Sequence, residues 1–216
     1  MTHTSLARPH GAQGRAGRTA RTAAAITRAA AVFLLAALIP HAHAGLEEGR
    51  QKSQTCAACH GADGNSPAPA IPSLAGQPRQ FIVTSLFMFR EGRRVNDAMT
   101  PFVAKLSNAD LNDLAQYFAA QKLTPPARKA EPDIVARGKA ITEKNNCVQC
   151  HKADLTGQQH IPRIAGQHKD YLLEQLKGFK AATRGDFDGT MTSAAQALTP
   201  EELEPLAEYL ATLAAP

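Results

Sequence analysis

The sequence CAACHGADG at residues 56–64 places two cysteines three positions apart, and a histidine follows directly after the second. The pattern returns as CVQCH at residues 147–151, and the two copies contain all four cysteines of the chain. A redox-active disulfide of the thioredoxin type belongs beside a strand–helix–strand unit, for which the sequence shows no pattern. A zinc site built from all four cysteines would leave both histidines without a role. Both alternatives are weak, and one explanation should cover both copies.

A repeat of about 90 residues surrounds the two motifs. The segment IPSLAGQ at residues 71–77 returns as IPRIAGQ at residues 161–167, and each is followed by a helical pattern, a basic glycine-containing segment and a methionine. Because such a repeat indicates a duplicated structural unit, we expect two domains, at residues 45–124 and 133–216. The proline-rich residues 125–132 between them are expected to form a linker.

The first 44 residues have the pattern of a secretory signal peptide. Residues 1–28 carry five arginines and no acidic residue, the apolar run AAAVFLLAALI follows, and HAHAG supplies small residues for cleavage after Ala44. The run is about half the roughly 20 residues of a membrane-spanning helix, which argues against an anchor, and its compactness argues against an amphipathic mitochondrial transit peptide. Cleavage would remove five of the 24 basic residues and leave 19 to balance the 19 acidic ones, which gives no support for nucleic-acid binding.

The remaining pattern predicts an all-α protein. Ser107 and Thr199 are typical N-caps before amphipathic runs, and two further helices are expected to begin near Pro78 and His168. Neither half shows a convincing alternating strand pattern. With 5% aromatic residues and no tryptophan, domains of this size rarely fill a core unaided, so we expect a cofactor at the centre of each.

Cys-x-x-Cys-His is the attachment sequence of c-type haem. Cysteines at positions i and i+3 lie on the same side of a helical turn, where each can form a thioether bond with one vinyl group, and the next residue can bind the iron. Two copies behind an export signal therefore predict two covalently bound haems c. The predicted attachment residues are Cys56, Cys59, Cys147 and Cys150, and the predicted iron ligands are His60 and His151.

Methionines at matching positions of the repeat are the candidates for the second axial ligand. Met99 lies 39 residues after the first motif histidine and Met191 lies 40 residues after the second, both in segments expected to form loops. Met88 falls within a predicted helix and is expected to be a core residue, while His160 and His168 are interpreted as surface or helix-start residues. Methionine ligation leaves the iron no open position, so the sequence predicts an electron carrier rather than an enzyme.

The chain resembles the dihaem cytochrome c4 family in CAACHGADGNS, IPSLAGQ, the MTPF segment, the proline linker, CVQCHKADLTG and IPRIAGQH. The resemblance covers essentially everything after the predicted signal peptide, and each half resembles a class I cytochrome c domain. It implies two haem-binding helical domains with a pseudo-two-fold axis and haem propionates that meet near the interface. It also implies that the carbonyl groups of Pro72 and Pro162 accept a hydrogen bond from the ligand histidines. The copies differ where Lys152 replaces Gly61 after the histidine.

The resemblance further implies a periplasmic protein, sometimes loosely associated with the membrane surface, that passes electrons toward a haem–copper terminal oxidase. Its redox partners would be an upstream cytochrome complex or dehydrogenase and a downstream oxidase. An alternative role is that of an electron-accepting cytochrome subunit of a periplasmic dehydrogenase that oxidises sulfur compounds or an alcohol. A dihaem peroxidase or thiosulfate-oxidising enzyme is less well supported, because such enzymes need an open or unusually ligated haem and no cysteine is left over.

Overall fold

The computed structural model describes residue 1, residues 40–125 and residues 127–214. The predicted signal peptide therefore lies outside the described residues except at its two ends. Contacts divide the chain into Met1–His43 and Ala44–Pro216, and the second unit contains both Cys-x-x-Cys-His motifs. In the described part of the chain, no helix has both the length and the apolar character needed to cross a membrane.

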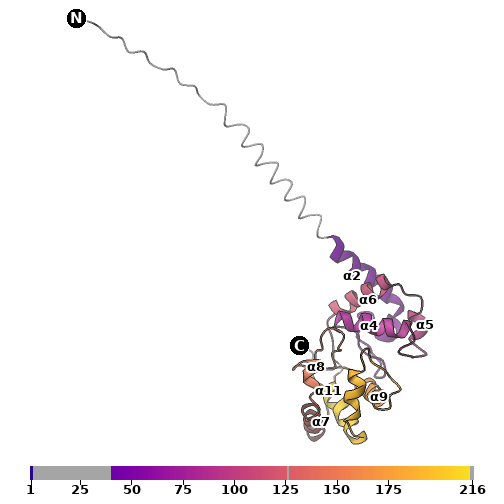
Figure 1. The fold of residues 1–216 in the computed structure, drawn as a ribbon, viewed down its shortest axis with the longest axis vertical. Coiled ribbons are helices and arrows are strands. Elements are labelled where there is room, and N and C mark those ends of the chain that lie inside the picture. Colours follow the sequence, from indigo (N-terminus) through magenta and orange to yellow (C-terminus); the bar gives the residue numbers. More distant parts are fainter. Residues whose placement is uncertain (2–39, 126, 215–216) are drawn as a thin grey trace. The chain divides into compact units, whose positions relative to one another are not determined.

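The described residues form helices and no strand beyond a single bridge between Gln158 and Ile161 (Figure 1). The first half contains α2 (Pro40–Lys52), the 3₁₀ turn η1 (Ser53–Thr55), α3 (Ala57–His60), α4 (Arg79–Arg90), α5 (Thr100–Val103) and α6 (Asn108–Ala120). The second half contains α7 (Pro132–Lys144), α8 (Cys147–His151), α9 (Lys169–Lys180), α10 (Thr190–Gln196) and α11 (Pro200–Thr212). The prediction of an all-α fold is confirmed.

Each half has its own hydrophobic core between a middle helix and a final helix. In the first half α4 packs on α6, and in the second half α9 packs on α11. The first core consists of Ile82, Leu114, Ala115, Tyr117 and Phe118. The second includes Leu172, Leu176, Leu203, Leu206, Ala207 and Leu210. In α6 and α11 these residues recur at helical spacing, so the amphipathic patterns of the sequence correctly indicated the buried faces of the two final helices.

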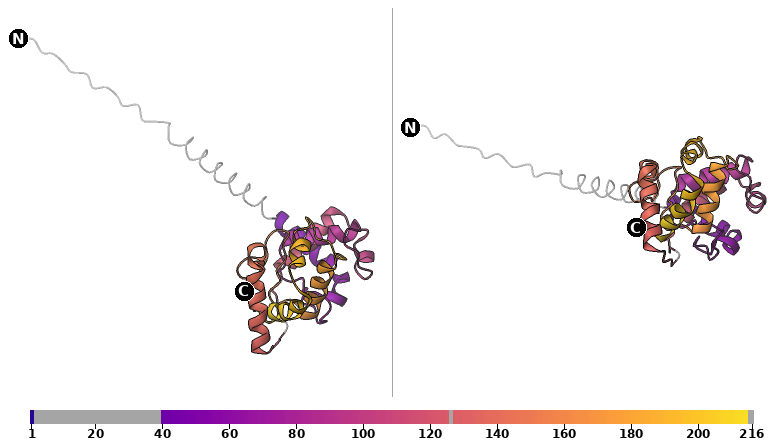
Figure 2. Two further views of the ribbon diagram at one scale, coloured as in Figure 1. Left: turned by 60° about the horizontal axis from the view of Figure 1, so that its bottom comes forward. Right: turned by 90° about the horizontal axis from the view of Figure 1, so that it is seen from below.

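Two helices that the sequence analysis did not identify, α2 and α7, pack closely on the final helices. Figure 2 shows α7 beside α11, with which it has extensive contact. Both contacts are built on a glycine: a Cβ on Gly49 would overlap with α6, and a Cβ on Gly138 would overlap with α11. The contact glycines carry no hydrophobic signal, and α7 buries one large apolar residue, Ile141, beside Gly138 and Thr142, which is why the sequence pattern is weak.

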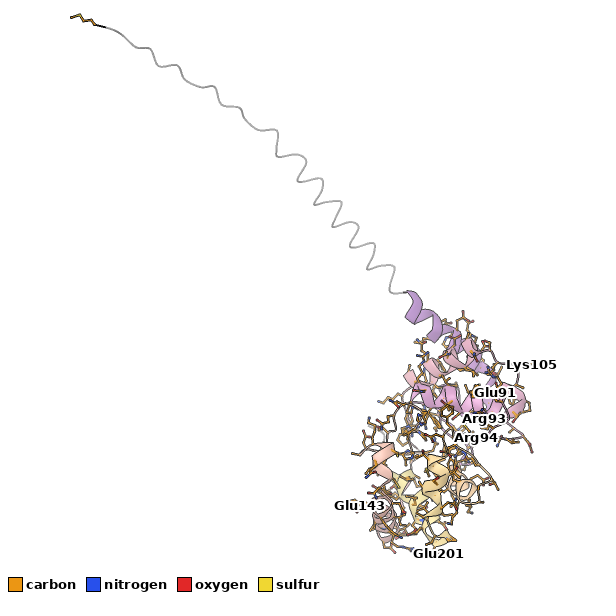
Figure 3. The ribbon with its side chains drawn as sticks, in the orientation of Figure 1. Glu91, Arg93, Arg94, Lys105, Glu143 and Glu201 are labelled. Atoms are coloured by element: carbon orange, nitrogen blue, oxygen red, sulfur yellow. The ribbon has the colours of Figure 1, made fainter. Side chains whose placement is uncertain are left out.

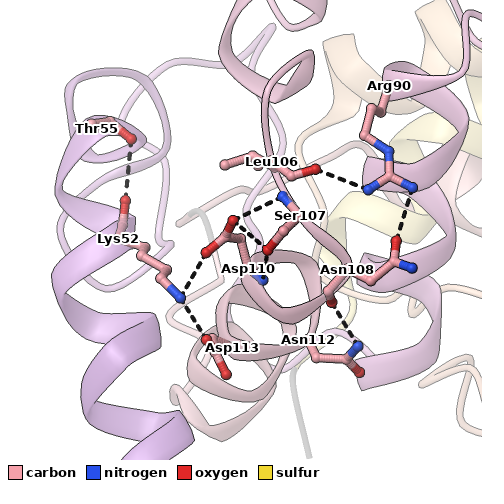
Figure 4. A network of polar contacts seen from close by, with 9 residues as sticks. All are labelled: Lys52, Thr55, Arg90, Leu106, Ser107, Asn108, Asp110, Asn112 and Asp113. Carbon is pink, nitrogen blue, oxygen red and sulfur yellow. Dashed lines mark hydrogen bonds and ion pairs between the residues drawn. The ribbon is translucent and has the colours of Figure 1, made fainter.

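The start of α6 carries a network of polar contacts that joins it to α2 (Figure 4). Ser107 is the predicted N-cap, and it forms a capping box with Asp110, because each accepts a hydrogen bond from the other's backbone N–H, at 3.2 and 2.8 Å. Lys52 at the end of α2 contacts Asp110 at 2.7 Å and Asp113 at 2.6 Å. The cap of one helix thus also fixes the end of its neighbour.

Candidate haem sites

A cavity of about 1060 Å³ lies within the Ala44–Pro216 unit and is lined by residues of both halves. Its volume is slightly above the range of about 300–1,000 Å³ that is usual for a single ligand. Every residue that the sequence analysis assigned to a site lines it: Cys56, Cys59, His60, Pro72, Met99, Cys147, Cys150, His151, Pro162 and Met191. Residues that lie far apart in the sequence are therefore brought to one place.

The two motif histidines are buried and held through one ring nitrogen. His60 is 5% exposed and its Nδ1 lies 2.9 Å from the carbonyl oxygen of Pro72. His151 is 7% exposed and its Nδ1 lies 2.8 Å from the carbonyl oxygen of Pro162. Because a carbonyl oxygen can only accept, Nδ1 carries the hydrogen and the lone pair of Nε2 is free to bind a metal.

Burial also keeps these imidazoles neutral. It lowers the pKa of His60 and of His151, and the bond to the proline carbonyl offsets this only in part. A neutral imidazole is the form that binds iron. The protein environment therefore holds each histidine in the neutral form that can bind a metal through Nε2.

The cysteines of each motif lie on a single helical turn and their thiols are free. In the first motif the backbone N–H of Cys59 donates to the carbonyl of Cys56 at 3.2 Å, which defines the turn. Burial raises the pKa of the Cys56 and Cys147 thiols. Among the described residues, no group of three or more His, Cys, Asp and Glu side chains is placed to hold a metal ion.

The turn that follows each histidine has the same unusual backbone in both halves. Gly61 has a φ of 79° and Lys152 has a φ of 70°. A Cβ on Gly61 would collide with the carbonyl oxygen of Asn65, so only glycine fits there. The second half has a lysine with a similar φ at the matching position, so the left-handed turn is retained although the residue differs.

Met99 lies in the turn directly before a short helix, in agreement with the expectation of a loop. Met191 lies inside a short helix, so the expectation is wrong for this residue. Met99 is the N-cap of α5, and Met191 lies in the first turn of α10. A side chain accepts the backbone N–H of each: Asn96 Oδ1 at 2.9 Å from Met99, and Asp186 Oδ2 at 2.7 Å from Met191. These polar contacts satisfy N–H groups that a helix start leaves unpaired, and they fix the backbone from which each methionine extends.

The other candidate ligands have different roles. Met88 is 5% exposed and belongs to the core, as predicted. His168 is the N-cap of α9, as expected of a helix-start residue, but it is buried and its Nε2 donates to the carbonyl of Ser66 at 2.9 Å. His160 is partly exposed, with Nε2 3.2 Å from Asp188 Oδ2. The interpretation of His168 as a surface residue is wrong, because the opposite half covers it.

Arginines that the sequence analysis did not assign to the site also line the cavity. Arg94 lies between the halves (Figure 3), where its Nη2 donates to Tyr171 Oη at 3.2 Å and to Gln175 Oε1 at 2.9 Å. The Nε atoms of Arg163 and Arg184 are shielded from solvent and have no hydrogen-bond partner among the described residues. Burial lowers the pKa of both guanidinium groups to about 10. The repeat itself contained a clue, since Arg94 and Arg184 are 90 positions apart.

These observations fit haem better than a zinc ion or a disulfide. Haem is a large apolar disc with two vinyl groups, two carboxylates and an iron that accepts axial ligands. The cavity offers an apolar lining, a pair of thiols in each half, and histidines with a free Nε2. The unpaired Nε atoms of Arg163 and Arg184 are the kind of donor that a buried carboxylate requires.

Comparisons with known proteins agree with this chemistry. Residues 135–214 match the family model described as cytochrome c, and residues 47–118 match the model described as cytochrome c oxidase, cbb3-type, subunit III. The chain is 34% identical over 183 residues to cytochrome c4 of Pseudomonas aeruginosa, an alignment that covers 80% of this chain and 90% of that protein.

Two further comparisons extend the match. The crystal structure of reduced recombinant cytochrome c4 from Pseudomonas stutzeri superposes with a TM-score of 0.72 and 31% identity over 78% of this chain and 98% of that chain. A protein of Thiomonas intermedia named thiosulfate dehydrogenase electron acceptor is 32% identical over 197 residues, which are 85% of this chain and 90% of that protein. The predicted pair of cytochrome c domains with covalently bound haem c is confirmed, and the chain is a member of the cytochrome c4 family of dihaem electron carriers.

Proposed function

We propose that this protein is exported to the periplasm, after cleavage near Ala44, and carries electrons between other redox proteins through two six-coordinate haems. The observation that supports this most directly is the cavity that both motifs and both methionines line. In the proposal, Cys56 and Cys59 attach the first haem, and His60 and Met99 bind its iron.

The second site repeats the same arrangement. Cys147 and Cys150 would attach the haem, and His151 and Met191 would bind its iron. Bound haem supplies a one-electron redox centre at the iron. The side chains of this chain hold that centre, exclude water from it and leave no position for a substrate, so the proposed activity is electron transfer alone.

The proposed domains are residues 45–124 and 133–216, joined by residues 125–132. Each half has its own core between a middle and a final helix, which supports this division. Arg128 lies within the proposed linker, and its Nη2 donates to Glu208 Oε2 of α11 at 2.8 Å. The linker is thus tied to the second domain.

A haem–copper terminal oxidase is the electron acceptor that we propose. The first half matches a family model described as a subunit of a cbb3-type cytochrome c oxidase. This match supports electron transfer toward the oxidase, since it relates that half to a protein of the oxidase itself. The near balance of charge after export is compatible with a small protein that binds its partners briefly.

A second candidate is the role of electron acceptor for a thiosulfate dehydrogenase. The relative of Thiomonas intermedia carries that name and spans nearly the same length as this chain. Stopped-flow measurements discriminate the two roles: the oxidised protein is mixed with a thiosulfate dehydrogenase and thiosulfate, and the reduced protein is mixed with membranes that contain a cbb3-type oxidase. Rapid reduction in the first assay with slow oxidation in the second would favour the dehydrogenase.

Single replacements of the methionines test the ligand assignment. Met99→Ala and Met191→Ala should each remove the near-infrared charge-transfer band of methionine-ligated haem from one haem and leave it on the other. Met88→Leu is the matched control, because Met88 is a buried core residue and its replacement should retain both bands. A full band in either alanine variant, or a lost band in the control, would contradict the assignment.

A further inference from the structure

Two glutamines at matching positions of the repeat reach across the interface and bind the backbone of the opposite half. Gln77 is 4% exposed and Gln167 is 2% exposed. Gln167 Oε1 accepts the N–H of Ser73 at 2.9 Å, and Gln167 Nε2 donates to the carbonyl of Ser73 at 2.9 Å. Gln77 binds Arg163 in the same way, with both distances 3.0 Å. Each buried side chain is thus fixed by two hydrogen bonds to a single residue.

The residues that the glutamines bind follow the prolines that hold the histidines. The N–H of Ser73 and the carbonyl of Pro72 belong to one peptide group, and so do the N–H of Arg163 and the carbonyl of Pro162. Each of these peptide groups therefore accepts at its oxygen from a motif histidine of its own half, at 2.9 and 2.8 Å. It also donates from its nitrogen to a glutamine of the other half.

A peptide group that donates at its nitrogen becomes a stronger acceptor at its oxygen, because chains of hydrogen bonds polarise one another. The effect is strengthened inside a protein, where the dielectric constant is low. A stronger acceptor draws the Nδ1 hydrogen of the histidine and makes the imidazole a more basic ligand. A more basic ligand favours ferric over ferrous iron and so lowers the reduction potential.

We propose that each glutamine sets the reduction potential of the haem in the opposite half. Gln167, in the second half, acts on the first haem through Ser73, Pro72 and His60. Gln77, in the first half, acts on the second haem through Arg163, Pro162 and His151. Both glutamines line the cavity, but they are proposed here as positioning residues that act on the iron through the peptide group and the histidine. The inference depends on the histidine ligation proposed above.

The test is a redox titration of the holoprotein and of the variants Gln167→Leu and Gln77→Leu. The two haems are followed separately by the paramagnetic proton resonances of their axial methionines. Gln167→Leu should raise the potential of the His60 haem, so that its reduced-to-oxidised ratio at a fixed potential increases about two- to tenfold, with ~59 mV at the upper end. The His151 haem should shift by less than half as much, and Gln77→Leu should give the reverse result.

Each variant is the matched control of the other, since both remove the same side chain from the same interface. If the glutamines merely hold the halves together, the reduction potentials of both haems should shift by the same amount in both variants. The same result is expected if leucine opens the interface. That outcome would overturn the proposal, and so would unchanged potentials or a shift of the haem in the glutamine's own half.

The variant Gln167→Glu separates polarisation from mechanical support. A carboxylate still accepts the N–H of Ser73 but cannot donate to its carbonyl. The potential of the His60 haem should therefore stay the same or fall, and the Nδ1 proton resonance of His60 should move opposite to its direction in Gln167→Leu. A rise in potential equal to that of the leucine variant would refute the polarisation. Methionine resonances in the wild-type spectrum test the ligands independently, so failure of the ligand assignment is distinguishable from failure of this inference.

Discussion

Replacing Gly49 with alanine tests the close packing of α2 on α6. A Cβ at this position would lie 2.7 Å from the carbonyl carbon of Asp113 and 2.8 Å from the Cβ of Tyr117, and it would overlap with the carbonyl oxygen of Asp113. Carbon atoms in good contact lie about 3.5–4.0 Å apart. The atoms involved belong to the backbone or are attached to it directly, so no change of rotamer can relieve the overlap.

The helices must then separate by about 1 Å, which forfeits up to half of the attraction between the atoms at their contact. Overpacking of this kind typically costs about 1–3 kcal/mol, and a rigid backbone places Gly49→Ala at the upper end. The higher helix propensity of alanine returns up to ~1 kcal/mol. We expect a net destabilisation of about 2 kcal/mol, which corresponds to a fall in Tm of roughly 4–8 °C for a domain pair of this size.

Thermal unfolding of the holoprotein, followed by far-ultraviolet circular dichroism, measures this change. Gly138→Ala should give a similar loss, because its Cβ would overlap with the carbonyl oxygen of Pro205 and the Cβ of Tyr209 in α11. Gly185→Ala is the control: its Cβ would meet only the carbonyl oxygen of Arg93, at 3.9 Å, and its effect should stay within about 0.5 kcal/mol. An unchanged or raised Tm in Gly49→Ala would refute the reasoning.

Two further predictions concern charged groups. A hydrogen bond from Lys52, and then those from Ser107, lower the pKa of Asp110 from 3.8 to about 2. The ionised carboxylate should therefore contribute roughly 1 kcal/mol, after solvent screening, to the free energy of unfolding. This contribution should be complete above about pH 5 and disappear as the pH falls toward 2. Denaturant unfolding of wild type and Asp110→Asn across this range measures it, and a constant difference at all pH values would contradict it. Glu208 binds the linker through Arg128, whose hydrogen bond is the main cause of the lowered pKa of Glu208. Glu208→Gln should therefore lower the free energy of unfolding by roughly 1–2 kcal/mol and speed tryptic cleavage after Lys129. An unchanged cleavage rate would count against this role.

The sequence predicted those features that depend on local patterns. The large apolar residues of α6 and α11 recur at helical spacing, and Ser107 is followed by Asp110 three positions later, so both the buried faces and the cap could be inferred. The Cys-x-x-Cys-His motif has a single-turn geometry that needs no tertiary information. Met99 and Met191 could be proposed as ligands because they occupy matching positions in the two copies of the repeat.

Other features depend on how the two halves meet, which no local pattern contains. The α2 and α7 helices bury glycines, and a glycine carries no hydrophobic signal. His168 has the sequence context of an exposed helix start, but it is buried and hydrogen-bonded to the carbonyl of Ser66 in the other half. Arg184 was missed for the same reason, since an arginine in a polar segment is ordinarily solvated and here burial depends on tertiary structure.

The paired glutamine contacts give the join between the halves the character of a homodimer within one polypeptide. In such an isologous interface one patch of surface pairs with its own copy, so each contact occurs twice. A single half already carries both partners of the contact, namely the glutamine and the peptide group that it binds. Because the partner is main chain, Ser73 and Arg163 have been free to diverge in side chain while the contact persists. A gene duplication followed by fusion would therefore need no new interface, only a linker long enough to connect two copies that already fit each other.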